Sequence, residues 1–162
     1  MFWVNLILPF TLFKFRTLKK EPVANESAFV EEGDDRVLIA GRFMRRWRID
    51  ELPQLINVLR GEMSIAGPRP ERPKIAESLE REIPFYAFRY SVRPGITGWA
   101  QVNGRNALSW EDKFALDVWY VDNQSLWLDT KILFMTLIKV VKRDGVSQEG
   151  HVTMEPFRGS QD

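Results

Sequence analysis

The decisive stretch of the sequence is Arg48-Ile49-Asp50-Glu51-Leu52-Pro53-Gln54-Leu55-Ile56-Asn57-Val58-Leu59-Arg60-Gly61. Its apolar residues recur at positions 52, 55, 56 and 59, which is the i, i+3, i+4, i+7 spacing of one helical face. Asp50 stands where an N-cap belongs, Pro53 suits the first turn and Gly61 suits the end of a helix. The stretch therefore predicts a helix over residues 51–60.

Four further helical or rigid segments follow from the residues on the C-terminal side. Gly67-Pro68-Arg69-Pro70 predicts a stiff, non-helical segment, because each proline fixes its own φ and restricts the residue before it. Residues 72–82 predict a short charged helix. Ser109 begins a variant of the capping box and predicts a helix through about Val121, and Ser125 begins a last helix through about Lys142.

A β-hairpin is predicted over residues 94–104. Gly95, Gly98 and the turn signal Asn103-Gly104 surround the apolar residues of this stretch. Together with the helices, the hairpin predicts an α/β domain that is mostly helical and carries a small antiparallel sheet. The chain divides into an apolar N-terminal remnant (1–13), a domain (14–145) and a tail (146–162).

Composition restricts the chemistry that the chain can perform. Its 162 residues are 44% apolar, and 23 Lys and Arg nearly balance 22 Asp and Glu, so neither disorder nor strong attraction to nucleic acid is expected. The absence of cysteine excludes disulfides, thiolate catalysis and cysteine-ligated metals. The single histidine, His151, argues against a histidine-rich metal site. Catalysis would have to rest on carboxylates, arginine or lysine, and an oxygen-ligated cation.

Residues 1–13 carry no charged side chain. They are fewer than the roughly 20 residues that a helix needs to span a bilayer, and they lack the basic start of a secretory signal. Two interpretations stay open, a buried helix or strand and an interfacial anchor kinked at Pro9. The aromatic residues around positions 84–90 form a second short apolar patch near basic residues, which suits either a membrane interface or a core.

Asp50-Glu51 directly follows a basic run, residues 36–48, which contains no acidic side chain. A helix N-terminus would keep Asp50 ionised, and an ionised, anchored carboxylate can act as a nucleophile on phosphorus while its neighbour holds a cation. By spacing alone, an ordinary capping role is the simpler explanation of the pair and the favoured one.

Arginines are the second candidate group. Several of them could bind the phosphates of a nucleoside diphosphate through their planar guanidinium groups, or they could form a solvated basic face or contact anionic lipid. Arg69 differs from the others because two prolines hold its backbone still, which suits the orientation of a reacting phosphate.

The ordered motifs together resemble the bacterial sugar transferase family, the monotopic phosphoglycosyl transferases, from about residue 12 to about residue 159. The motifs are Phe13-Lys14-Phe15-Arg16-Thr17, the stretch 48–64, Gly67-Pro68-Arg69-Pro70, the stretch Arg93 to Asn106, and the helix containing Trp110, Lys113, Asp117 and Tyr120-Val121. The ending, residues 145–153, is similar to that of the small members that use UDP-diacetylbacillosamine.

The resemblance implies transfer of a sugar 1-phosphate from a UDP-sugar to undecaprenyl phosphate at the cytoplasmic face of the bacterial inner membrane. It implies that Asp50 attacks the β-phosphate, that UMP leaves, and that the lipid phosphate attacks the aspartyl-phosphosugar. Glu51 would hold Mg²⁺, Arg45 would lie near the lipid phosphate, and Arg69 would be the rigid active-site arginine. The substrate-binding residues carried over are Arg16, Arg93, Arg105 and Asp117.

The sequence departs from the family at its N-terminus. Members carry a hydrophobic helix that enters and leaves the membrane before the Phe-Lys-Phe-Arg motif, whereas twelve residues precede that motif here. We therefore expect most of this membrane segment to be missing and membrane binding to be weak and dependent on anionic lipid. A non-catalytic relative that kept its fold as a membrane-binding or partner-binding domain stays open as an alternative, and a nucleic-acid binder is a more distant one.

Overall fold

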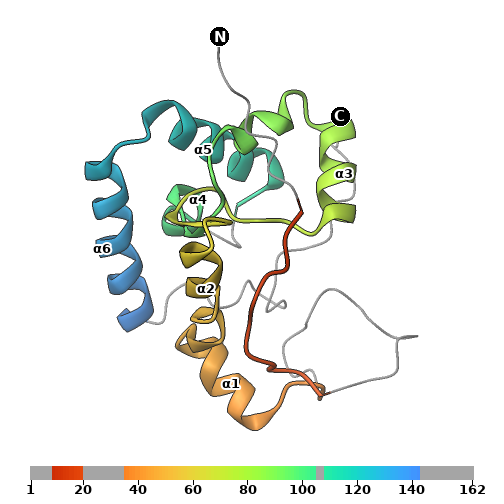
Figure 1. Ribbon diagram of the computed structural model, residues 1–162, viewed down its shortest axis with the longest axis vertical. Helices are drawn as coiled ribbons and strands as arrows, with labels where there is room; N and C mark the ends of the chain where they lie inside the picture. Colours follow the sequence, from red (N-terminus) through yellow and green to blue (C-terminus); the bar gives the residue numbers. More distant parts are fainter. Residues whose placement is uncertain (1–8, 20–34, 105–107, 143–162) are drawn as a thin grey trace.

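The computed structural model describes residues 9–19, 35–104 and 108–142, and Figure 1 shows their arrangement. The helices, in chain order, are α1 (Ile39–Arg46), α2 (Gln54–Leu59), α3 (Pro73–Glu82), α4 (Trp99–Val102), α5 (Trp110–Asn123) and α6 (Leu126–Lys142). Between them lie the 3-10 helices η2 (Ile49–Glu51) and η3 (Tyr86–Ser91) and the strands β1 (Ser64–Ala66) and β2 (Gly95–Thr97). The described residues are mostly helical, as the sequence predicts.

β1 and β2 form a parallel pair, in which Ser64 lies opposite Gly95 and Ala66 opposite Thr97. Parallel strands require a long connection, and here that connection contains α3 and η3. The predicted antiparallel hairpin over residues 94–104 is therefore wrong. β2 occupies the start of that stretch, and α4 follows it directly.

The glycines of this stretch serve close backbone approach rather than a hairpin turn. A Cβ atom on Gly95 would collide with the backbone nitrogen of Gly67, and one on Gly98 would collide with the Gly67 carbonyl oxygen. Asn103 ends α4, because its backbone N–H donates to the carbonyl oxygen of Trp99 at 3.2 Å and its side-chain amide donates to the same oxygen at 2.8 Å. The glycines thus let β2 press against the segment that follows β1.

Helix α5 contacts both apolar clusters of the core. The first cluster contains Ala66, Val102, Tyr120, Leu128 and Ile132, from β1, α4, α5 and α6. The second contains Leu79, Ile83 and Tyr86, with Trp110 and Phe114 of α5 packed against it. Because it contributes to both clusters, α5 holds the sheet and α3 in one arrangement (Figure 1).

The predicted C-terminal helices are confirmed, including their first residues. The Ser109 hydroxyl accepts a hydrogen bond from the backbone N–H of Asp112 at 3.0 Å, which caps α5. The Ser125 hydroxyl accepts one from the N–H of Leu128 at 3.2 Å, just before α6. The charged helix predicted over residues 72–82 is α3.

The helix predicted over residues 51–60 is shorter in the structure, and it buries its polar face where an ordinary amphipathic helix would bury its apolar face. Only α2 is α-helical within this stretch, and the separate 3-10 turn η2 precedes it. Gln54 and Asn57 are buried, while the apolar residues at positions 52, 55, 56 and 59 are between 45% and 88% exposed. The apolar face identified from the sequence therefore points away from the core.

Helix α6 also presents apolar side chains to the outside. Leu126 and Trp127 at its start, and Phe134, Leu137 and Val141 further along, are each more than 60% exposed. Within the described ranges, no helix combines the length and the apolar character that a membrane crossing requires.

Candidate active site

Asp50 and Glu51 lie in η2, the short turn between α1 and α2. The residue before this turn, Arg48, has φ 56° and ψ 20°, the left-handed conformation that costs free energy for a residue with a side chain. Pro53, not Asp50, precedes α2 at its N-cap, without a side-chain capping bond. The predicted N-cap role of Asp50 is therefore wrong, because Asp50 lies inside η2 and Pro53 occupies the N-cap position of α2.

The N-terminal segment, residues 9–19, holds this turn from outside (red in Figure 1). The backbone N–H of Phe15 donates to the carbonyl oxygen of Asp50 at 3.1 Å. The fully buried side chain of Asn57 accepts from the N–H of Phe13 at 3.1 Å and donates to the carbonyl oxygen of Thr11 at 2.8 Å. These contacts explain why α2 buries a polar side chain, since Asn57 satisfies backbone groups that have no strand partner.

Glu51 connects three segments of the chain. Its carboxylate oxygen Oε1 lies 2.5 Å from Nη2 of Arg69 and 3.3 Å from Nζ of Lys14. Lys14 comes from the N-terminal segment, and Arg69 comes from the Pro-Arg-Pro segment after β1. The Glu51 side chain is only 10% exposed, so the two cations compensate a carboxylate that is largely removed from water.

Burial and the neighbouring Glu51 raise the pKa of Asp50 above its ordinary value of 3.8, while the positive charges of Lys14 and Arg45 oppose that rise. Burial, together with the charge of Arg69, lowers the pKa of Lys14. The pKa of Arg69 is raised, chiefly by Glu51. The site thus consists of two adjacent carboxylates with the cations Lys14, Arg69 and Arg45 close to them.

Arg45 reaches the site from the last turn of α1. Its Nε donates to the hydroxyl of Thr17 at 2.8 Å. The close approach behind this contact depends on Gly41, because a Cβ there would collide with the carbonyl oxygen of Thr17. The basic helix is thereby fixed against the N-terminal segment, and Arg45 is near enough to lower the pKa of Asp50.

The structure brings Asp50, Glu51, Arg45 and Arg69 together, and it places the predicted substrate-binding residues in different surroundings. Arg16 and Arg93 are exposed. Asp117 is buried on α5, where its Oδ2 lies 2.7 Å from Nη2 of Arg89. Arg105 and His151 lie outside the described residues.

Two residues at the site had no role in the sequence prediction. Lys14 stands in the quoted Phe-Lys-Phe-Arg motif, and that motif was the signal that could have assigned it. Arg89 donates to the carbonyl oxygen of Arg69 at 2.7 Å and carries no local motif. Its contact with the Pro-Arg-Pro segment becomes evident only in the structure, where η3, part of the connection between β1 and β2, lies against that segment.

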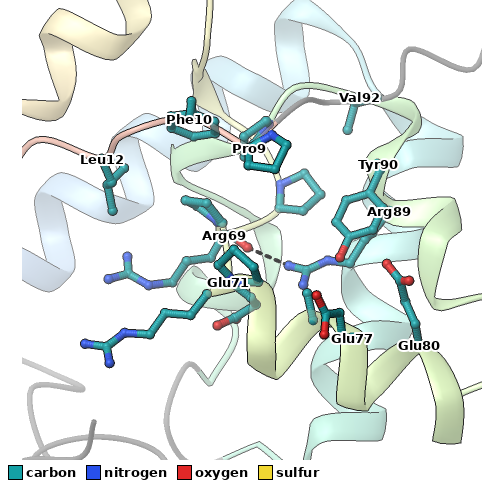
Figure 2. Close-up of a pocket in the computed structure, with 16 residues that line it drawn as sticks. Pro9, Phe10, Leu12, Arg69, Glu71, Glu77, Glu80, Arg89, Tyr90 and Val92 are labelled. Atoms are coloured by element: carbon teal, nitrogen blue, oxygen red, sulfur yellow. Dashed lines mark hydrogen bonds between the residues drawn. The ribbon is translucent and has the colours of Figure 1, made fainter. Parts of the chain in front are cut away.

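A cavity of about 430 Å³ lies beside the Pro-Arg-Pro segment, whose residues 68–70 form part of its lining. It lies between the N-terminal segment and α3, and Figure 2 shows Arg69, Glu71, Arg89 and Tyr90 around it, with Pro9 at its edge. Neither Asp50 nor Glu51 lines the cavity. Arg69 therefore both lines the cavity and contacts the carboxylate of Glu51.

A family model described as bacterial sugar transferase matches residues 7–143. The chain belongs to this family. Its relatives include EpsL of Bacillus subtilis, named an uncharacterized sugar transferase, which is 51% identical over 158 residues, or 95% of this chain and 74% of EpsL.

Other relatives of this sugar transferase carry names that state a reaction. The UDP-N-acetylgalactosamine-undecaprenyl-phosphate N-acetylgalactosaminephosphotransferase of Aeromonas hydrophila is 46% identical over 79% of this chain. The UDP-glucose:undecaprenyl-phosphate glucose-1-phosphate transferase of Caulobacter vibrioides is 41% identical over 84% of it. The chain spans only 31% and 53% of these two proteins, so the family's shared domain is what they have in common.

Proposed function

We propose that the chain is a phosphoglycosyl transferase, which transfers a sugar 1-phosphate from a UDP-sugar to undecaprenyl phosphate in a bacterium. The names of the relatives support the two substrate classes. The observation that carries the proposal is the half-buried carboxylate of Asp50 beside the Glu51, Arg69 and Lys14 cluster. One nucleophile among fixed cations suits the transfer of a negatively charged phosphoryl group.

In the first step, a carboxylate oxygen of Asp50 attacks the β-phosphorus of the UDP-sugar. The bond between that phosphorus and the bridging oxygen breaks, and UMP leaves with the bonding electron pair. Lys14 and Arg69 would stabilise the charge that develops on the phosphoryl oxygens. The product is an aspartyl-phosphosugar, in which the sugar 1-phosphate is bound to Asp50.

In the second step, a phosphate oxygen of undecaprenyl phosphate attacks the same phosphorus. The bond to Asp50 breaks, its carboxylate is restored, and the sugar is left on a lipid diphosphate. Arg45, whose Nε donates to the Thr17 hydroxyl, would attract the lipid phosphate as it approaches Asp50. Arg16, Arg93, Arg105 and Asp117 remain proposed contributors to substrate binding.

The residues present also fit Mg²⁺. Among the described residues, no three acidic or histidine side chains form a cluster, but Mg²⁺ is commonly held by one or two carboxylates together with substrate phosphates. Asp50 and Glu51 supply two adjacent carboxylates, and burial together with the charge of Glu51 raises the pKa of Asp50. We propose that Glu51 would hold the ion, which when bound would neutralise charge on the phosphoryl oxygens.

We further propose that the protein rests on the cytoplasmic face of the bacterial inner membrane. The exposed apolar residues of α2 and α6 support this placement, because large apolar surfaces in water mark sites that bind partners or lipid. Lys131, Lys139 and Lys142 lie on α6 among them, which suits anionic head groups. Such a position would bring a lipid phosphate toward the site.

The test is UMP release from UDP-sugars by the full chain in vesicles that contain undecaprenyl phosphate and Mg²⁺. We expect UMP and a lipid-linked sugar diphosphate from the wild-type protein, and neither from Asp50→Asn, in which a neutral amide replaces the nucleophile. Release at the wild-type rate by Asp50→Asn would exclude Asp50 as the nucleophile. A folded wild-type protein that releases no UMP with any UDP-sugar would favour the non-catalytic binding domain.

A further inference from the structure

Arg89 is a buried arginine that the proposed reaction does not use. It lies in η3 with only 2% of its side chain exposed. Its Nη2 contacts Oδ2 of Asp117 and the carbonyl oxygen of Arg69, both at 2.7 Å, and its Nη1 donates to the hydroxyl of Tyr86. Figure 2 shows the bond to Arg69 as a dashed line.

Stability alone does not explain this arrangement. Burying an ion pair costs hydration free energy of both groups, and replacing such a pair by apolar residues of similar volume is often neutral or stabilising. An apolar pair, however, could not donate a hydrogen bond to the Arg69 carbonyl oxygen. The contact to the Pro-Arg-Pro segment therefore requires a hydrogen-bond donor here, which an apolar side chain cannot supply.

The contact fixes one of the two peptide planes that flank Arg69. The plane before Arg69 contains the Pro68 carbonyl oxygen, which accepts from the N–H of Gly95 at 2.9 Å. The plane after it contains the Arg69 carbonyl oxygen, which accepts from Arg89. Because two fixed planes determine φ and ψ of the residue between them, they also determine the direction in which the Arg69 side chain leaves the backbone.

A second contact ties the same segment to α5. Nζ of Lys113 lies 2.5 Å from Oε1 of Glu71, and both side chains are nearly buried. Lys113 precedes Asp117 by four residues, so the two lie on one face of α5. This helix therefore holds the segment twice, at Glu71 directly and at Arg69 through Arg89.

We propose that Arg89, held by Asp117, is a positioning residue that fixes the peptide plane after Arg69 and so directs the Arg69 guanidinium toward Glu51. Its consequence for catalysis rests on the proposed function, whereas its effect on Arg69 does not. Nη2 alone contacts both Asp117 and the Arg69 carbonyl oxygen. Arg89→Lys keeps a positive charge beside Asp117, but its side chain is one bond shorter, so its ammonium cannot occupy the Nη2 position and make the hydrogen bond to the Arg69 carbonyl as well.

The first test needs no activity. The Nε–H resonance of Arg69, assigned by its loss in Arg69→Lys, is followed by NMR in the full-length protein. We expect it to shift in Arg89→Lys and to stay in place in Tyr120→Phe. Tyr120→Phe is a matched control, since Tyr120 lies on α5, the helix that carries Asp117, and its hydroxyl lies 3.2 Å from a carbonyl oxygen of the same region, that of Ala66. An unchanged resonance in folded Arg89→Lys would overturn the proposal.

The second test is a double-mutant cycle on kcat for UMP release. We expect Arg89→Lys to lower kcat by roughly tenfold to a hundredfold in the wild-type background, the cost of a misplaced catalytic group, and by less than about twofold in Arg69→Ala. Equal losses in both backgrounds would mean a purely structural role. If the wild-type protein releases no UMP but the Arg69 resonance moves, the proposed function fails and the positioning role stands.

Discussion

Glu51→Gln tests the charge cluster at the centre of the site through its stability. Gln keeps an acceptor oxygen but removes the negative charge that Arg69 and Lys14 share. A hydrogen bond to a charged group contributes about 1.5–3 kcal/mol, and the half-exposed Lys14 adds less than about 1 kcal/mol. Relief of the repulsion between Glu51 and Asp50 offsets part of this loss. We expect a net destabilisation of about 2 kcal/mol, which for a chain of this size lowers Tm by roughly 4–8 °C.

The assay is urea and thermal unfolding followed by circular dichroism, with Glu62→Gln as the matched control. Glu62 is also a partly buried carboxylate, but Oε2 accepts from the neutral amide of Asn57 at 2.7 Å. Its neutral replacement should therefore cost less than about 1 kcal/mol. If Glu51→Gln unfolds within about 0.5 kcal/mol of the wild type, the range of an ordinary surface substitution, the compensation of buried charge described for Glu51 is refuted.

Three further predictions concern the same site and its surroundings. Arg69→Lys should impair UMP release almost as much as Arg69→Ala, because the charge survives but the planar donors do not; a Lys variant with most of its activity would reduce Arg69 to a general charge. Glu51→Gln should lower the pKa of Asp50, since Glu51 raises it; the ionised form then persists to lower pH in a ¹³C-carboxyl NMR titration, and an unchanged titration would contradict the assigned cause. Vesicle flotation should show binding that needs anionic lipid and weakens with salt, because surface charges are screened beyond about 8 Å at physiological ionic strength. Leu59→Ser, at a side chain that is 88% exposed, should weaken that binding without lowering Tm, and salt-resistant binding to neutral vesicles would refute the interfacial mode.

Local signals in the sequence predicted the helices well where the signal and its effect lie within one turn. Ser109 caps α5 as expected because its hydroxyl bonds an N–H three residues later. The helix of residues 51–60 was placed correctly in part, but its buried face was not evident. Burial of Asn57 depends on the backbone of residues 11–13, which no periodicity within the helix records.

The hairpin failed for a related physical reason. Glycine in a strand pattern marks either a turn or a close backbone approach, and the sequence does not show which. Here Gly95 and Gly98 face Gly67, a residue far along the chain. Contacts between distant parts of the chain also bring Arg69 to Glu51. The family motifs predicted that these two residues act in one site, but they did not predict this ion pair.

The candidate site was predicted from motifs rather than from geometry. Asp50, Glu51 and Arg69 stand out by their sequence context, and the resemblance gives them and Arg45 their roles. In the structure Asp50 and Glu51 lie in η2, with Arg69 and Arg45 near them. Arg89 was missed because its role depends on a contact to a backbone oxygen, and any residue can present such an oxygen. Positions that act through backbone contacts leave little trace in a single sequence.

The most direct test of the central proposal is the intact mass of the protein after incubation with a UDP-sugar and Mg²⁺ in the absence of undecaprenyl phosphate. We predict a covalent adduct with the mass of the sugar phosphate, located on Asp50 by peptide sequencing, accompanied by one equivalent of UMP and discharged when the lipid phosphate is added. Asp50→Asn should form no adduct. Lipid-linked product formed at the normal rate with no adduct at any time would contradict the proposal, because it would require direct transfer between the two substrates.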